Sequence, residues 1–228
     1  MRLDHNRASA LCARSINRKL RTPGTGGRAD GVIEDTSRIS ASDVSNVIIW
    51  GNHSATQYPD LAHAVVTLRT HRPAPARSIL DKDFVDGEFI AQIQTRGAKV
   101  MEARRMSSAL VRLTCFTPDI PYFALRNLGL CYPNLPLIVA QSAAHAVAGH
   151  MRDWMYGTSD GEIVSMAVYS DGKHYGVPKG LIFGFPCTCK DGKWEIVEDM
   201  WIHPFGRQMI EKNISELLSE AETAQSCP

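Results

Sequence analysis

Long apolar runs are missing from this chain of 228 residues. No run approaches the roughly 20 residues that a membrane-spanning helix needs, so we expect no membrane as a partner. The opening of a secretory signal peptide is missing as well, because Asp4 and Asn6 stand where its apolar core would begin. With a formal net charge of +1, the chain has little excess charge of either sign, and we expect no nucleic acid as a partner.

Cysteines with the spacing of a metal site are also missing. The chain has 6 cysteines but no Cys-x-x-Cys pair, so we predict neither a zinc site nor another metal centre. Cys187 and Cys189 should lie on one face of a strand, and they are too close in sequence to suggest a structural disulfide. We expect reduced thiols, as in cytosolic proteins.

What the chain does have is the composition of a globular protein, with 44% hydrophobic and 21% charged residues. Helices are predicted at 2–20, 83–105, 143–154 and 204–223. Short apolar or β-branched runs predict strands at 44–50, 65–68, 163–169, 181–189 and 194–197. A hairpin turn is expected at 190–193, and loops are expected from 51 to 60 and from 71 to 78. The apolar stripe of the last helix should comprise Met209, Ile210, Ile214, Leu217, Leu218 and Ala221.

The stretch from Gly24 to Ala29 nominally fits the dinucleotide fingerprint Gly-x-Gly-x-x-Ala. Such a loop needs a buried strand before it and a helix after it, so that a pyrophosphate meets the N-terminus of the helix. The segment from Arg18 to Pro23 that precedes it is no buried strand. We therefore predict an ordinary loop here rather than a nucleotide site.

Asp4, Arg7 and His53 are the residue types needed to move a proton on an anionic hydroxy acid. His53 comes just after the apolar run Val47–Trp50, so a rigid strand can aim it. Asp4 and Arg7 stand three residues apart and share one face of a helix. Arginine binds a carboxylate through two parallel hydrogen bonds, histidine exchanges a hydroxyl proton, and aspartate fixes the histidine tautomer. A solvated Asp–Arg ion pair and an ordinary turn histidine are the alternative interpretation.

The residues around this trio form a longer pattern, which begins with Arg2–Ala8 and Asn46–Asp60. The pattern resumes at Gln94–Val100, Ser107–Leu110, Arg152–Trp154, Gly161–Met166, Val168–Gly172 and Tyr175–Pro178. Over most of the chain it closely resembles malate dehydrogenases of the cytosolic type, in the lactate/malate dehydrogenase family. Lactate dehydrogenases share the Asp-x-x-Arg and histidine arrangement, but the stretch 50–57, Trp-Gly-Asn-His-Ser-Ala-Thr-Gln, matches the malate enzymes.

This resemblance implies an α+β fold over 1–228, the C-terminal substrate domain of the family, with helices packed on an antiparallel sheet. It also implies an NAD-dependent L-malate dehydrogenase that interconverts (S)-malate and oxaloacetate in malate metabolism and the tricarboxylic acid cycle. We expect this enzyme to be cytoplasmic and homodimeric.

The resemblance also assigns roles to individual residues. His53 accepts the hydroxyl proton of malate, Asp4 orients His53, and Arg7 binds the C1 carboxylate. Leu3 is expected to contact the nicotinamide. Ser107 and Ser108 are expected to line the substrate pocket.

The chain departs from the family pattern in three places. No strand–glycine loop–helix unit precedes Arg2, so we expect the N-terminal NAD-binding domain to be missing and the chain to be a truncated form. Segments at about 14–38 and 111–141 interrupt the pattern and are predicted to be insertions, such as unspliced sequence.

Two other functions have to be weighed. A chain without a nucleotide domain could be catalytically inactive and act at most as a dimerisation partner of a full-length enzyme. A hydrolase that uses Ser54 or Ser165 would need a Gly-x-Ser-x-Gly elbow, which the sequence lacks. Ser54 also adjoins His53 in sequence rather than facing it.

Overall fold

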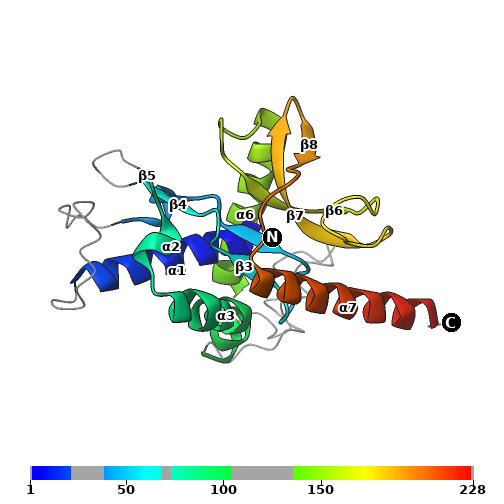
Figure 1. Ribbon diagram of the computed structural model, residues 1–228, viewed down its shortest axis with the longest axis horizontal. Coiled ribbons are helices and arrows are strands. Elements are labelled where there is room, and N and C mark those ends of the chain that lie inside the picture. Colours follow the sequence, from blue (N-terminus) through cyan, green and yellow to red (C-terminus); the bar gives the residue numbers. More distant parts are fainter. Residues whose placement is uncertain (1, 22–38, 68–72, 104–135, 227–228) are drawn as a thin grey trace, which may run out of the picture.

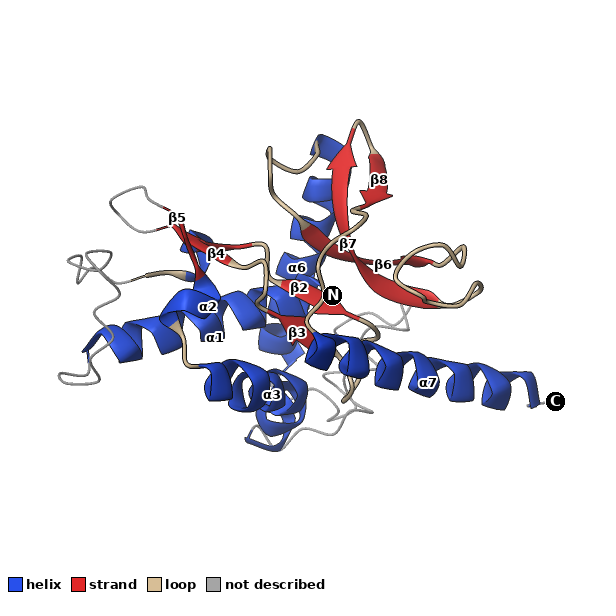
Figure 2. Ribbon diagram, viewed as in Figure 1, coloured by secondary structure: helices blue, strands red, loops and turns tan. Residues whose placement is uncertain are grey.

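The computed structural model describes residues 2–21, 39–67, 73–103 and 136–226 (Figure 1). Their elements, in chain order, are α1 (Arg2–Arg21), η1 (Ala41–Asp43), β1 (Val44–Ser45), β2 (Ile48–Trp50), β3 (Tyr58–Asp60), β4 (Val65–Thr67), β5 (Pro73–Pro75), α2 (Ala76–Ile79), η2 (Phe84–Glu88), α3 (Phe89–Ala103), α6 (Pro136–Tyr156), β6 (Val164–Tyr169), β7 (Ile182–Lys190), β8 (Lys193–Ile196) and α7 (Pro204–Ser226). Every strand pair among these residues is antiparallel, in sheets of order β1-β4-β5, β2-β3 and β6-β7-β8. Figure 2 shows α7 running past β3 and the β6-β7-β8 sheet standing against α6. The predicted α+β class is confirmed.

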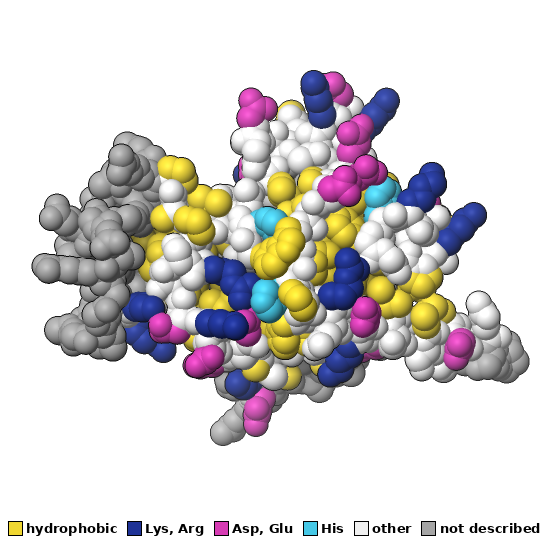
Figure 3. Space-filling view, in the orientation of Figure 1, with side chains coloured by type: hydrophobic (Ala, Val, Ile, Leu, Met, Phe, Trp, Pro, Cys, Tyr) yellow, Lys and Arg dark blue, Asp and Glu magenta, His cyan; other side chains and the backbone are white. Residues whose placement is uncertain are grey.

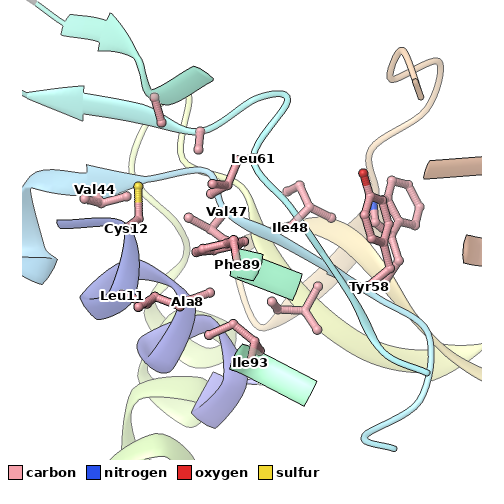
Figure 4. Close-up of a cluster of buried hydrophobic side chains, with 14 of the residues drawn as sticks. Ala8, Leu11, Cys12, Val44, Val47, Ile48, Tyr58, Leu61, Phe89 and Ile93 are labelled. Carbon is pink, nitrogen blue, oxygen red and sulfur yellow. The ribbon is translucent and has the colours of Figure 1, made fainter. Parts of the chain in front are cut away.

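The core lies where α1, the strands after it and α3 meet (Figure 4). The predicted first helix is confirmed, and it presents Ala8, Cys12 and Ile16 at four-residue spacing, all fully buried. Val47 and Phe89 fill the space against this face. A fully buried Val or Phe side chain contributes about 1.5–3 kcal/mol, so these contacts fix α1 against the strand that leads to His53.

The predicted strand 44–50 is wrong as a single strand. The structure has β1 and then β2, interrupted at Asn46, whose φ of 56° lies in the left-handed region that asparagine tolerates better than most residues. Asn46 Nδ2 donates to the Gly161 carbonyl at 3.1 Å, and its Oδ1 accepts the Ile163 N–H at 2.9 Å. The break therefore fastens the first strands to the turn before β6.

Other boundaries also differ from the prediction. The loop expected up to residue 60 contains β3, and the loop expected at 71–78 contains β5 and most of α2. These strands are held by pairing with β2 and β4, which their own short sequences do not reveal. The helix predicted from residue 83 begins as a π-helical turn, η2, before α3. The helix predicted from residue 143 starts at Pro136, in the first position, where proline is tolerated.

The predicted insertions at 14–38 and 111–141 lie mostly outside the described residues. Within the first, residues 14–21 continue α1, and within the second, residues 136–141 begin α6.

The C-terminal half follows the prediction more closely. The strands β6, β7 and β8 and the helix α7 lie within three residues of their predicted bounds. The hairpin between β7 and β8 turns at Asp191 and Gly192, whose φ values of 51° and 74° suit a type I′ turn. Cys187 and Cys189 are buried free thiols. Burial raises the pKa of Cys187 to about 12, so this thiol is unreactive at neutral pH.

Within the described ranges, no helix is both long and apolar enough to cross a membrane. No group of three or more His, Cys, Asp or Glu side chains in that part of the chain could hold a metal ion. On the face shown in Figure 3, basic and acidic side chains are interspersed rather than gathered by sign.

Gly51 joins two of the sheets. Its N–H donates to the Gly184 carbonyl at 3.2 Å and its carbonyl accepts the Gly184 N–H at 3.0 Å, so the end of β2 pairs with β7. Gly51 has a φ of 86°, and a Cβ at this position would lie 2.3 Å from Cγ of Asn213 in α7. Both the backbone and the neighbouring helix therefore require glycine.

Replacing Gly51 with alanine should lower the free energy of unfolding by at least about 2 kcal/mol. The left-handed backbone costs an alanine about 1–2 kcal/mol, and the overlap with Asn213 adds about 1–3 kcal/mol. Gly161→Ala is the matched control, because Gly161 has a φ of 76° but open space around its Cβ position. Urea unfolding of both variants beside the wild type measures the difference. Equal losses in the two variants would contradict the close approach of α7.

Asp60 is a buried carboxyl at the end of β3. Its Oδ1 accepts the Ala62 N–H at 2.8 Å, and its Oδ2 accepts Trp50 Nε1–H at 3.4 Å. Burial raises the pKa of Asp60 above its ordinary value of 3.8, although these hydrogen bonds and the His63 ring partly oppose the shift. The folded chain therefore holds this proton more tightly than the unfolded chain does.

Because the folded pKa is raised, the stability that protonated Asp60 contributes is full below the ordinary carboxyl pKa and is lost as the pH rises through the folded pKa. In Asp60→Asn the side chain at this position cannot ionise, so its contribution to stability does not fall as the pH rises. The unfolding free energy of the variant minus that of the wild type should therefore increase as the pH rises from about 4 to about 7. Urea unfolding at several pH values tests this. A difference that does not change with pH, or that decreases, would contradict the raised pKa.

Candidate active site

The loop 51–57 between β2 and β3 carries His53, and α7 binds both ends of this loop. Asn213 Oδ1 accepts the Asn52 N–H at 2.9 Å, and Asn213 Nδ2 donates to Thr56 Oγ1 at 2.7 Å. The Asn213 side chain is fully buried. A buried carboxamide needs hydrogen-bond partners, and here the loop supplies them.

One turn further along α7, Glu216 binds the middle of the same loop. Its Oε2 accepts the Ser54 hydroxyl at 2.8 Å and also the Thr56 hydroxyl. Ser54 Oγ in turn accepts the Thr56 N–H at 3.1 Å. The hydroxyl that a Ser54 hydrolase would use as its nucleophile is thus bonded to a carboxylate of α7.

The other serine considered for a hydrolase, Ser165, has a structural part. Its side chain is 2% exposed, and its hydroxyl accepts the Ile49 N–H at 2.8 Å. It therefore fastens β2 to β6 within the core and has no access to solvent.

The far end of the loop is held by α3. Gln94 Nε2 donates to the Gln57 carbonyl at 2.9 Å. Within the loop, the His53 N–H donates to Asn52 Oδ1 at 2.8 Å. Together with the pairing of Gly51 and β7, these bonds hold the loop from three different elements, which gives His53 a defined backbone position.

The His53 side chain is exposed and borders an open groove of about 430 Å³. The groove is also lined by Leu181 and Ile182, and by Leu217 and Glu220 of α7. The imidazole therefore stands where a small molecule can reach it, which a proton-transfer group requires.

The start of α1 lies beside β2 (Figure 2). The His5 ring donates from Nδ1 to the Val47 carbonyl at 3.0 Å, which fixes the first turn of the helix against the chain that enters β2. Asp4 and Leu3 belong to this first turn, and their side chains lie outside the described part of the structure.

Arg7 follows one turn later on α1 and points toward α3. Its Nη1 lies 3.8 Å from the position that a Cβ on Gly97 would take, so the glycine leaves room beside the guanidinium. The Arg7 side chain is thus half-buried between α1 and α3.

Ser107 and Ser108 lie outside the described residues, so the structure places neither of them. The roles of Asp4, Arg7 and His53 stay predictions. Sequence reasoning missed Asn213 and Glu216, the residues that bind the His53 loop. A signal was available for Asn213, because it stands three residues after Ile210, inside the apolar stripe of the last helix.

The strands of the described residues differ from those of a βαβ dinucleotide-binding unit. Such a unit has two parallel strands joined by a helix, with a glycine-rich turn at the N-terminus of the helix. All strand pairs in the described ranges are antiparallel. This type of dinucleotide site is therefore not formed by the described residues.

The family described as lactate/malate dehydrogenase, alpha/beta C-terminal domain, matches residues 1–112 and 139–227. The cytoplasmic malate dehydrogenase of Zea mays is 40% identical over 200 residues, which cover 88% of this chain and 51% of that protein. The cytoplasmic malate dehydrogenase of Bos taurus is 37% identical over 223 residues, 98% of this chain and 51% of that protein. The chain thus spans about half the length of the curated relatives it matches.

Solved structures of malate and lactate dehydrogenases also resemble this chain. Malate dehydrogenase from Naegleria fowleri has a TM-score of 0.65 and 31% identity, over 97% of this chain and 51% of that chain. Trichomonas vaginalis lactate dehydrogenase, solved in complex with NADH and oxamate, has a TM-score of 0.71 and 25% identity, over 99% of this chain and 53% of that chain. This chain belongs to the lactate/malate dehydrogenase family and has the fold of the family's C-terminal domain.

Proposed function

We propose that this chain carries the substrate-binding and proton-transfer part of an L-malate dehydrogenase, which reversibly oxidises (S)-malate to oxaloacetate with NAD. The observation that carries the proposal is the loop 51–57. In a chain of this family, it presents His53 at the end of β2 and is bonded to β7, α7 and α3. A proton-transfer group has to be held in one place, and this loop is built to do so.

The proposed chemistry divides among three side chains. Arg7 binds the C1 carboxylate of malate or oxaloacetate through two parallel hydrogen bonds. His53 accepts the proton of the C2 hydroxyl as malate is oxidised and returns it in the reverse direction. Asp4, bonded to the other ring nitrogen, fixes the tautomer of His53 and stabilises the imidazolium. NAD, when bound, accepts the hydride from C2.

Three further residues complete the proposal. Leu3 contacts the nicotinamide, and Ser107 and Ser108 line the substrate pocket.

The cytoplasm is the proposed compartment, since the maize and cattle relatives are named cytoplasmic malate dehydrogenases. The proposed assembly is a homodimer that serves malate metabolism, including the tricarboxylic acid cycle.

For the domain organisation, we propose a single C-terminal catalytic domain over 1–228 with insertions at about 14–38 and 111–141. The second insertion is supported by the family match, which leaves out residues 113–138. The first has no comparable support, because the match runs through it without a break.

A second candidate function has an observation in its favour. The chain spans about half the length of its curated relatives, and the described strands pair only antiparallel, without a βαβ unit. A catalytically inactive chain that acts at most as a dimerisation partner of a full-length enzyme fits these two facts. Turnover by the purified chain separates the two candidates.

The test is oxaloacetate-dependent oxidation of NADH by the purified chain and by its His53→Asn variant. The variant should lose at least about 100-fold in rate, because a positioned proton-transfer group contributes about 10²–10⁴-fold. Its circular dichroism should match the wild type, since His53 is exposed. His145→Asn, at an exposed position on α6, is the control and should keep the wild-type rate.

Wild-type turnover that survives in His53→Asn would remove His53 from its proposed role. A wild-type chain without turnover would reject the first candidate for this polypeptide and favour the second.

Gly97 tests the role of Arg7 from the neighbouring helix. Gly97→Ala should raise the free energy of unfolding by up to about 1 kcal/mol, because the Cβ fits and alanine favours a helix. Gly97→Leu should reach the Arg7 guanidinium and raise the KM for oxaloacetate about tenfold or more, which corresponds to one charged hydrogen bond lost. Ala98→Leu, at an exposed neighbouring position, should leave the KM unchanged. An unchanged KM in Gly97→Leu would count against Arg7 as the carboxylate ligand.

A further inference from the structure

Asn213 is a buried polar residue within the apolar stripe of α7. It is 0% exposed, like Ile210 one turn earlier, and Ile214 and Leu217 pack beside it against the core. An apolar side chain of similar size at this position would pack α7 against the core as well or better. The carboxamide is therefore suited to a purpose other than docking the helix.

That purpose is visible in its partners. The Asn213 side chain bonds to Asn52 and to Thr56, the residues one before and three after His53. The carboxamide oxygen accepts a backbone N–H, and the carboxamide nitrogen donates to a hydroxyl. One rigid planar group therefore sets the distance between the two ends of the loop.

Glu216 lies three residues after Asn213 and so on the same face of α7. It accepts the hydroxyls of Ser54 and Thr56. The two α7 side chains thus bind the residue directly before His53 and the residue directly after it. The His53 side chain itself borders the groove.

We propose that Asn213 and Glu216 are positioning residues for the His53 imidazole, which makes the C-terminal helix α7 part of the catalytic apparatus. The proposal rests on the proposed proton-transfer function of His53. Displacement of a reacting group by about 1 Å can cost about 10²-fold in rate. Asn213 and Glu216 bond to the loop at Asn52, Ser54 and Thr56, so they keep His53 in place without touching the substrate. Gly51 allows this arrangement, because it lets Asn213 approach the backbone.

The first test observes His53 without any activity. The His53 imidazole resonance is identified by its loss in His53→Asn, and amide exchange is followed at Asn52 and Thr56. In Asn213→Ala, the imidazole resonance should move toward that of an unstructured histidine, and the Asn52 amide should exchange about tenfold faster or more. The amide of Val168, which pairs with Phe183 in the β6–β7 ladder, should keep its wild-type exchange rate.

The second test uses the conservative variant at Glu216. Glu216→Gln keeps an oxygen that accepts a hydroxyl, so it should retain the wild-type imidazole resonance, whereas Glu216→Ala should not. Glu211→Ala changes an exposed carboxylate on another face of α7 and should have no effect. In the kinetic assay, Asn213→Ala should lower kcat about 10- to 100-fold and leave the KM for oxaloacetate within about threefold, because Arg7 binds the carboxylate from another element.

An unchanged imidazole resonance and Asn52 exchange rate in Asn213→Ala would overturn the proposal. So would an equal acceleration of exchange in the β6–β7 ladder, which would mean that Asn213 only stabilises the fold. Equal effects of Glu216→Gln and Glu216→Ala would remove Glu216 from the proposal. If the wild-type chain does not turn over oxaloacetate, the proposed function fails, while the resonance and exchange measurements still decide the positioning.

Discussion

The hydrogen bonds between Asn213 and the loop 51–57 are the constraint on which the rest of the candidate site depends. They join the last helix to a segment more than 150 residues earlier in the chain. They form only because Gly51 has no side chain and takes a left-handed backbone, and because β7 holds Gly51 through Gly184. Loss of any one of these features would weaken the support of the His53 loop, so the position of the imidazole depends on the strands and the helix together.

The same principle holds the small sheets together. Three antiparallel sheets of two or three strands would be marginal alone, because so few strands bury little apolar surface. Polar side chains join them at defined points: Asn46 reaches the turn before β6, and Ser165 accepts a backbone N–H of β2. The bonds to the Ile163 and Ile49 N–H groups are half-buried and buried, so breaking either leaves an unsatisfied group, at a cost of about 1–3 kcal/mol. The apolar core supplies most of the stability, and the polar anchors determine how the elements are aligned.

Local patterns predicted the elements that local interactions determine. The four helices were evident from periodicity or from resemblance, and the β7–β8 hairpin from Asp191 and Gly192. The short strands β3 and β5 were not predicted, because they exist only through pairing with β2 and β4. The candidate site divides in the same way. His53 and Arg7 stand in recognisable sequence. The place of Asn213 in an apolar stripe marks it as unusual, but its partners Asn52 and Thr56 lie too far away in sequence for any local pattern to reveal them.

Whether Arg7 and His53 act on one molecule can be decided by a crystal structure of the chain with oxamate, the 2-oxo acid analogue bound in the Trichomonas vaginalis lactate dehydrogenase structure. We expect its carboxylate to lie on the Arg7 guanidinium and its carbonyl oxygen to accept a hydrogen bond from the His53 ring at about 2.6–3.2 Å. Oxamate bound away from both side chains, or a His53 ring that contacts no part of it, would contradict a shared substrate site for the two residues.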